Sequence, residues 1–272
     1  MISDSFLHSY DHIIVSNATL CTFIGNLTFG TNYTDMSNAL TMIYALIALL
    51  EISAEFFDMP LLRVATKPLL MPVLIFAFVQ GVGTLSNIHK ILVAAFFFSW
   101  IGDVALMFVP KSVEDVELIG IAKNPNFFLA GLGGFLVTHI LYITAFVKSA
   151  DDKTPLLKRN PIVAAPLIAY FVALIFWIFP PVPTEMKVPV VVYSLTIALM
   201  VLAAMNNFGR VPRNMFLNGF TGALLFMLSD SIIAVNKFIF NEQLPLAGVC
   251  IMVLYITAQY FIAKAFVGKN VQ

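Results

Sequence analysis

Residues 96–107 read Phe-Phe-Phe-Ser-Trp-Ile-Gly-Asp-Val-Ala-Leu-Met, an apolar run that contains one carboxylate, Asp103. Residues 224–235 read Leu-Leu-Phe-Met-Leu-Ser-Asp-Ser-Ile-Ile-Ala-Val, an apolar run whose acid is Asp230. On insertion scales, a charged residue such as Asp near the middle of a lipid-spanning helix costs roughly 2.5–3.5 kcal/mol. A chain that carries this cost twice is expected to need both acids, so Asp103 and Asp230 are the candidate catalytic residues.

The composition of the chain is that of a polytopic membrane protein. Its 272 residues are 60% hydrophobic and 11% charged, with a mean hydropathy of +0.92, whereas soluble domains are about 45–50% apolar and about 25% charged. The formal net charge is zero, so charge gives no reason to expect a nucleic-acid partner. Cys21 and Cys250 stand in unrelated contexts and predict neither a disulfide framework nor a metal site.

Apolar segments of the length that a bilayer requires, about 20 residues, follow one another along most of the chain. We expect about eight spans, at Asn38–Phe57, Lys67–Gly83, His89–Phe108, Asn126–Val147, Pro161–Phe179, Val188–Met205, Met215–Phe238 and Pro245–Val267. Proline is predicted to open several of them, as at Pro68 and Pro189. The predicted fold class is an all-α polytopic membrane bundle over residues 38–268, preceded by an extension, residues 1–37, to which we assign no chemistry.

Two features suggest that the halves of the chain are related. Asp103 and Asp230 lie about 14 residues into the third and seventh predicted spans, and residues 141–145 and 254–258 both read Leu-Tyr-Ile-Thr-Ala. A parallel repeat of four plus four helices would bring both carboxyls to one depth. With eight spans both termini share one side, and that side has about nine basic residues against about six, so the positive-inside rule favours cytoplasmic termini.

Few other polar side chains fall within the predicted spans. The candidates for substrate binding are Lys67, His139, Tyr142, Tyr193, Ser229 and Gln259. Lys67, predicted to open the second span, would either snorkel to lipid headgroups or contact a substrate phosphate. His139 and Gln259 would more often join helices than bind substrate, and Ser229 would more often bond its own backbone. No spacing of His, Cys and carboxylates suggests a metal, and no cofactor is expected.

In their order and spacing, several of these residues resemble the YhhN-like (lysoplasmalogenase) family of integral membrane proteins. The resemblance covers about residues 40–265 and rests on Lys67-Pro68, Gly102-Asp103, Gly131 through His139 and Tyr142, Gly222 through Ser231 with Ala234, and Ala258-Gln259-Tyr260. It implies hydrolysis of the vinyl ether bond of lysoplasmalogens, which releases a fatty aldehyde and glycerophosphoethanolamine or -choline. The expected partners are therefore a lysophospholipid substrate and membrane lipid.

This chemistry would begin with protonation of the vinyl ether at carbon, followed by capture of the oxocarbenium ion by water. One carboxyl would then be protonated and the other ionised, by analogy with glycosidases. Asp230 is the candidate for the ionised partner, because Ser229 and Ser231 would donate hydrogen bonds to it. Two other functions stay open from the residues: a proton-coupled transporter and a non-catalytic lipid-binding membrane protein. The residues do not predict the oligomeric state.

Overall fold

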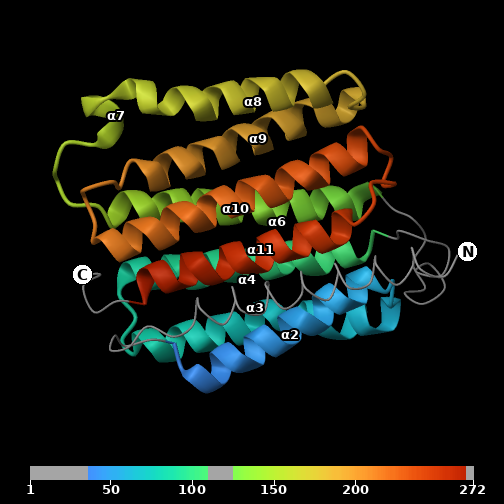
Figure 1. Cartoon of the computed structure of the whole chain (residues 1–272), viewed down its shortest axis with the longest axis horizontal. Helices are drawn as coiled ribbons and strands as arrows, with labels where there is room; N and C mark the ends of the chain where they lie inside the picture. Colours follow the sequence, from blue (N-terminus) through green and yellow to red (C-terminus); the bar gives the residue numbers. More distant parts are fainter. Residues whose placement is uncertain (1–35, 110–124, 268–272) are drawn as a thin grey trace, which may run out of the picture. The chain divides into compact units, whose positions relative to one another are not determined.

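The computed structural model describes residues 36–109 and 125–267, and in these the chain is a bundle of α-helices without strands (Figure 1). The helices are α2 (Asn38–Phe56), α3 (Pro60–Val82), α4 (Asn87–Met107), α6 (Pro125–Lys148), α7 (Leu156–Arg159), α8 (Ala165–Ile178, after the 3₁₀ turn Pro161–Ala164), α9 (Thr184–Met205), α10 (Arg213–Phe238) and α11 (Ala247–Phe266). Within the described ranges, eight of these segments are long and apolar enough to cross a membrane. The predicted fold class is confirmed, and the predicted extension lies almost wholly outside the described residues.

Two helices begin well before their predicted first residue. Helix α3 begins at Pro60 rather than Lys67, and α9 begins at Thr184 rather than Val188. An apolar run stops at the first charge, whereas the first turns of a helix tolerate charged side chains that reach the interface. The prediction that Pro68 and Pro189 open their spans is therefore wrong, because both lie inside helices.

The prolines inside α3 create a contact with α4. Pro72 has no N–H, so the carbonyl of Pro68, four residues earlier, lacks its helical donor. The indole Nε1 of Trp100 donates to that carbonyl at 2.9 Å. A side chain of α4 thus replaces the missing backbone donor, and this fixes α3 beside the helix that carries Asp103.

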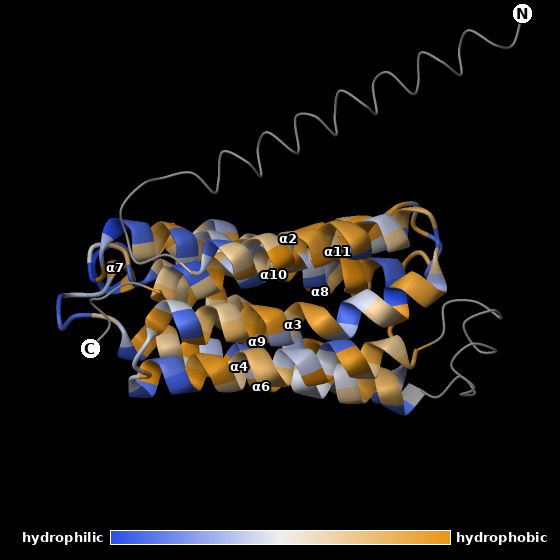
Figure 2. Cartoon of the chain, turned by 90° about the horizontal axis from the view of Figure 1, so that it is seen from below, coloured by the Kyte–Doolittle hydropathy of each residue, from blue (hydrophilic) through white to orange (hydrophobic). Residues whose placement is uncertain are grey.

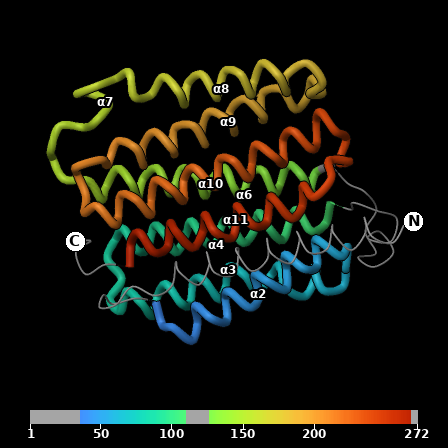
Figure 3. Tube along the Cα trace, viewed as in Figure 1, coloured from blue at the N-terminus to red at the C-terminus, as the bar shows by residue number. Residues whose placement is uncertain are grey.

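The long helices run back and forth along one direction in two layers. One layer contains α2, α11, α10 and α8, and the other contains α3, α4, α6 and α9 (Figures 1 and 2). In the trace of Figure 3, α4 and α10 run in the same direction, as predicted for the helices of the two acids. Figure 2 shows hydrophobic residues along the helices and hydrophilic ones mostly at their ends. Buried polar side chains therefore meet between the layers.

Small residues allow the two closest helix pairs, α4–α6 and α10–α11, to pack tightly. A Cβ at Gly134 would lie 2.9 Å from the backbone nitrogen of Gly102, and a Cβ at Gly222 would lie 2.9 Å from the carbonyl oxygen of Ala258. Such contacts exclude any side chain at these positions. The two halves of the chain are thus alike in having one tightly packed helix pair each. The repeat of four plus four helices stays a prediction.

Candidate active site

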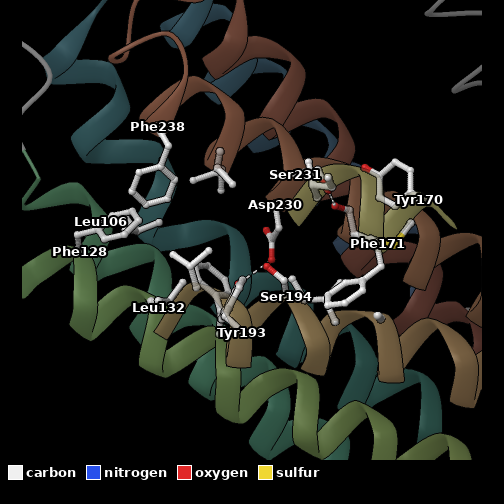
Figure 4. A pocket seen from close by; sticks show the side chains of 18 residues that line it. Leu106, Phe128, Leu132, Tyr170, Phe171, Tyr193, Ser194, Asp230, Ser231 and Phe238 are labelled. Carbon is white, nitrogen blue, oxygen red and sulfur yellow. Dashed lines mark hydrogen bonds between the residues drawn. The ribbon is translucent and has the colours of Figure 1, made fainter. Parts of the chain in front are cut away.

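A cavity lies among the ends and middles of α4, α6, α8, α9 and α10. Its lining is almost entirely apolar: Leu106, Phe128, Leu132, Phe135, Tyr170, Phe171, Leu174, Val190, Tyr193, Ser194, Ile197, Ala198, Met227, Asp230, Ser231, Ile233, Ala234 and Phe238. In Figure 4, Leu106, Phe128 and Phe238 gather at one end, Tyr170 and Phe171 lie at the other, and Asp230 stands between them. Among the described residues, Asp230 is the one carboxylate that lines this cavity.

The carboxyl of Asp230 is held from the opposite layer. The Tyr193 hydroxyl donates to Oδ2 at 2.6 Å, as Figure 4 shows, and His139 Nε2 lies 3.3 Å from the same oxygen. His139 is fully buried, and Asp230 is 8% exposed. Both contacts fall on Oδ2. Of the carboxyl's two oxygens, Oδ1 is therefore the one left for a ligand in the cavity.

The contacts of His139 determine which ring nitrogen carries the proton. Nε2 lies 3.3 Å from both Asp230 Oδ2 and the Tyr193 oxygen, and the single proton of Tyr193 is already given to Asp230. Both neighbours of Nε2 are therefore acceptors, which assigns the hydrogen to Nε2. Nδ1 is buried and has no hydrogen-bond partner. A neutral ring leaves only an acceptor unpaired there, whereas a protonated ring would bury an unpaired N–H donor.

The serines on either side of Asp230 do not hold it. Ser229 Oγ donates to the Ile251 carbonyl of α11 at 3.1 Å, and Ser231 Oγ donates to the Met227 carbonyl of its own helix at 2.7 Å. A hydroxyl has one proton to give, so the prediction that these serines donate to Asp230 is wrong. Ser231 lines the cavity, and Ser229 joins α10 to α11. The substrate-binding role predicted for Ser229 stays a prediction.

Asp103 belongs to a different group of side chains, which we call the Asp103 network: Ser99, Asp103, Tyr142, Tyr255 and Gln259. The Tyr255 hydroxyl donates to Asp103 Oδ2 at 2.5 Å, and Ser99 Oγ lies 2.8 Å from the Tyr255 oxygen. Gln259 Nε2 donates to Ser99 Oγ at 2.6 Å, and the Tyr142 hydroxyl donates to Gln259 Oε1 at 2.5 Å. All five side chains are buried.

The network has a single direction. Since Tyr255 gives its proton to Asp103, its oxygen must accept from Ser99. Ser99 in turn accepts from Gln259, which accepts from Tyr142. Every donor thus points toward Asp103, and such chains polarise one another in a medium of low dielectric. The arrangement stabilises negative charge on Asp103. This residue does not line the cavity.

Lys67 is not among the residues that line the cavity. It lies in the second turn of α3, half-buried, and its charge acts on the Asp103 carboxyl, as do those of Glu51 and Asp230. Glu51 of α2 is fully buried and accepts a 2.5 Å hydrogen bond from Thr66. The predicted phosphate contact of Lys67 stays a prediction.

Aromatic rings pack against the partners of both acids. Phe226 packs edge-on against His139 at 4.7 Å and against Tyr255 at 5.5 Å between ring centroids. Phe135, which lines the cavity, packs against Tyr255 at 5.9 Å and Phe226 at 6.1 Å. The partner of Asp230 and the partner of Asp103 thus both pack against the Phe226 ring. The two carboxyls share no hydrogen-bond partner among the contacts of the described residues.

Sequence reasoning missed Ser99, Tyr255 and Glu51. Ser99 and Tyr255 could have been recognised by their spacing. Ser99 precedes Asp103 by four residues and Tyr255 precedes Gln259 by four, which puts each pair on one helix face. Glu51 had the signal of an acid in an apolar run, the same one that identified Asp103. Within the described residues, no group of three or more His, Cys, Asp or Glu side chains is placed to hold a metal ion.

Comparison with known proteins places the chain in a family. A model of the YhhN family matches residues 62–266. The chain belongs to the YhhN family. That match includes all the predicted site residues, whereas Glu51 of α2 lies outside it. No solved structure matches the chain.

Several curated relatives carry one activity in their names. The chain is 33% identical over 147 residues to "Lysoplasmalogenase" of Mycobacterium tuberculosis (53% of each chain). It is 32% identical over 139 residues to "Lysoplasmalogenase TMEM86B" of Sus scrofa (51% of this chain, 54% of that one). It is also 32% identical over 163 residues to "Lysoplasmalogenase TMEM86A" of Homo sapiens (59% and 63%). The matched regions thus cover 53% to 63% of the length of these relatives.

Proposed function

We propose that this protein is a membrane-embedded lysoplasmalogenase, which hydrolyses the vinyl ether bond of a lysoplasmalogen to a fatty aldehyde and a glycerophospho-alcohol. The observation that carries the proposal is the apolar cavity with Asp230 at its middle. Both hydrogen-bond contacts of this carboxyl fall on Oδ2, which leaves Oδ1 for a ligand. An apolar lining suits a lipid chain, and a single carboxyl supplies the acid and base that the chemistry needs. The names and the identity of the relatives support the same activity.

The contacts of Asp230 suit both halves of this reaction. With its proton on Oδ1, Asp230 protonates the vinyl ether carbon, and the C–O side of the double bond becomes an oxocarbenium ion. The negative charge left on the carboxylate is stabilised by Tyr193 and His139, which already donate to Oδ2. Water then adds to the cation and gives its proton to Asp230, and the resulting hemiacetal collapses to aldehyde and alcohol. One carboxyl thus returns to its starting state.

This assignment differs from the expectation that Asp230 is the ionised partner of a two-carboxyl pair. Asp103 does not line the cavity, and its hydrogen bond comes from Tyr255. We propose that Asp103 acts on the reaction through its charge and through the position of α11, together with Lys67. Its role as a second catalytic carboxyl stays a prediction that mutation can separate from this one.

We further propose that both termini face the cytoplasm. The described chain begins and ends at the same end of the bundle as the α6–α8 and α9–α10 connections (Figure 1). Those connections carry Lys153, Lys158, Arg159 and Arg210, and basic loops favour the cytoplasmic side. A cysteine introduced at exposed Asp152 should react with a membrane-impermeant maleimide only after cells are opened. Labelling of intact cells would reverse the orientation.

The activity is tested with purified protein in detergent or lipid vesicles. Incubation with a lysoplasmalogen should release free fatty aldehyde. The matched lysophospholipid with a saturated ether should release none, because it lacks the vinyl double bond whose carbon is protonated. Absence of aldehyde with a well-folded wild-type protein would sink the hydrolase proposal. A proton flux across vesicles without aldehyde would favour the transporter instead.

A further inference from the structure

A lysine lies at the end of the cavity that Phe128 and Phe238 line. The ammonium of Lys237 lies 4.3 Å from the ring centroid of Phe128, and Phe128 and Phe238 both line the cavity. The Lys237 side chain is 25% exposed, so it is accessible from the end of the bundle where α10 gives way to the loop before α11. A cation at this point is placed to contact the polar part of a ligand whose apolar part fills the cavity.

The spacing along α10 relates this lysine to Asp230. The two residues are seven apart, which is close to two helical turns, so they lie on one face of α10 with Ala234 of the cavity lining between them. At 1.5 Å per residue their Cα atoms are about 10 Å apart along the helix. In a glycerol lysophospholipid, five bonds join the ether oxygen to phosphorus, a span of about 6 Å when extended at bond lengths near 1.5 Å. Adding a contact of about 3 Å gives a reach of about 9 Å, which is close to the spacing of Asp230 and Lys237 along α10.

The present partner of Lys237 is a carboxylate that a phosphate could replace. Glu242 Oε1 lies 3.0 Å from the ammonium, and the Glu242 side chain is 32% exposed. Glu242 has φ of 67° and Asn241 has φ of 49°, left-handed values that non-glycine residues adopt infrequently. Hydrogen bonds from Glu242 N to the Asn236 carbonyl and from Leu244 N to Asn236 Oδ1 hold this turn. The loop thus places an anion where the ligand's own anion would sit.

We propose that Lys237 binds the phosphate of the lysophospholipid and that Glu242 occupies its place when the cavity is empty. The inference rests on the proposed hydrolase function and specifies how that site takes its substrate. Phosphate on Lys237 sets the vinyl ether beside Asp230, and the apolar lining holds the part of the chain nearest to it. The end of the bundle that holds Lys237 is also opposite the end where the described chain begins and terminates (Figure 1).

Binding, rather than turnover, gives the direct test. Calorimetry in detergent compares a saturated 1-O-alkyl lysophosphoethanolamine, which this chemistry cannot cleave, with the 1-O-alkylglycerol of equal chain length, which lacks the phosphate. Wild type should bind the phospholipid more tightly. In Lys237→Gln this preference should fall by roughly 10- to 100-fold, the range for losing a hydrogen bond to a charged group. Lys237→Arg should retain part of it.

A second lysine at the same end of the bundle is the matched control. Lys187 also lies over an aromatic ring, 4.9 Å from the centroid of Phe179, and neither residue lines the cavity. Lys187→Gln should keep the full preference for the phospholipid. An equal loss in both variants would assign the effect to the general charge of this end, and a preference lost only in Lys67→Gln would return the phosphate to Lys67; either result overturns the proposal.

Glu242 offers a change in the opposite direction. Glu242→Gln removes the competing anion, so the phospholipid should bind several-fold more tightly while alkylglycerol affinity changes less. Weaker phospholipid binding in this variant would overturn the exchange of partners. Inorganic phosphate, added at the phospholipid's concentration, should not displace it, since it lacks the apolar chain; displacement would make free phosphate the ligand instead.

The inference and the proposed function fail in different ways. If the preference for phosphate depends on Lys237 but no aldehyde is released from lysoplasmalogen, the hydrolase proposal fails and the phosphate site stands. If aldehyde is released while Lys237→Gln keeps the wild-type preference, the phosphate site fails and the hydrolase proposal stands.

Discussion

Asp103 and Asp230 occupy corresponding places in similar sequence, yet their surroundings differ. Asp103 ends a buried series of four hydrogen bonds in which Tyr142, Gln259, Ser99 and Tyr255 all point toward it. Asp230 has two contacts on one oxygen and stands at the wall of a cavity. The first acid is thus enclosed by partners, and the second has room for a ligand.

The difference suggests how a membrane bundle assigns roles to two equally expensive acids. A carboxyl saturated by buried donors is fixed and inaccessible, which suits electrostatic and structural roles. A carboxyl with one oxygen held and the other directed to a cavity can exchange a proton with a substrate and still have its charge stabilised. Four mutations test whether the two acids have these different roles.

Asp230→Asn should have the largest effect. Removing the acid and base is expected to lower kcat for aldehyde release by about 10²- to 10⁴-fold, while binding of the saturated ether analogue changes little. The isosteric control is Asp152→Asn, at an exposed acid in the loop after α6, which should keep wild-type kcat. Near-normal turnover by Asp230→Asn would remove Asp230 from the chemistry.

Tyr193→Phe should come next. It deletes the 2.6 Å donor to Asp230 Oδ2 and keeps the ring, so kcat should fall by roughly 10- to 100-fold, as for a hydrogen bond to a charged group. Tyr170→Phe deletes a hydroxyl elsewhere on the cavity wall and should reduce kcat less. Equal losses in both variants would mean that the cavity needs polarity in general rather than support for Asp230.

Asp103→Asn tests the other side of the contrast. A unit charge at an assumed separation of about 10 Å and an effective dielectric near 20 contributes about 1.7 kcal/mol, so kcat should fall roughly 20-fold. Tyr255→Phe should act through the same contact, and the double variant should lose less than the two single effects combined. A loss as large as that of Asp230→Asn would restore the two-carboxyl mechanism.

Gln259→Leu should affect stability more than turnover. It leaves the Tyr142 hydroxyl without an acceptor and Ser99 without a donor, both buried between the layers. Such hydrogen bonds between membrane helices average about 0.6 kcal/mol, so a loss of about 1 kcal/mol is expected in thermal unfolding. Thr144→Val, whose hydroxyl bonds only its own helix at Ile140, is the control. A large kcat loss at unchanged stability would make the network part of the chemistry.

Positions along the chain were predictable where lipid imposes a length. Apolar runs located all eight candidate spans, and the early starts of α3 and α9 are the main deviation, because apolar counting stops at charges that helices accept. The exceptional acids were also visible, since a carboxylate in an apolar run is costly wherever its helix packs. Partners were not: His139 and Tyr193 were recognised as polar, but nothing in the sequence joined them to Asp230.

The helices, their order and the few polar groups that they carry follow from the amino-acid sequence alone, because hydrophobic length and periodicity are local properties. The packing of the helices decided that Tyr255 turns to Asp103 and that a cavity opens at Asp230. These contacts join residues as much as 152 positions apart. They depend on which helix faces meet between the layers, whereas glycines such as Gly134 and Gly222 set how closely helices pack within each layer. Two acids in similar sequence thus acquired different surroundings through packing alone.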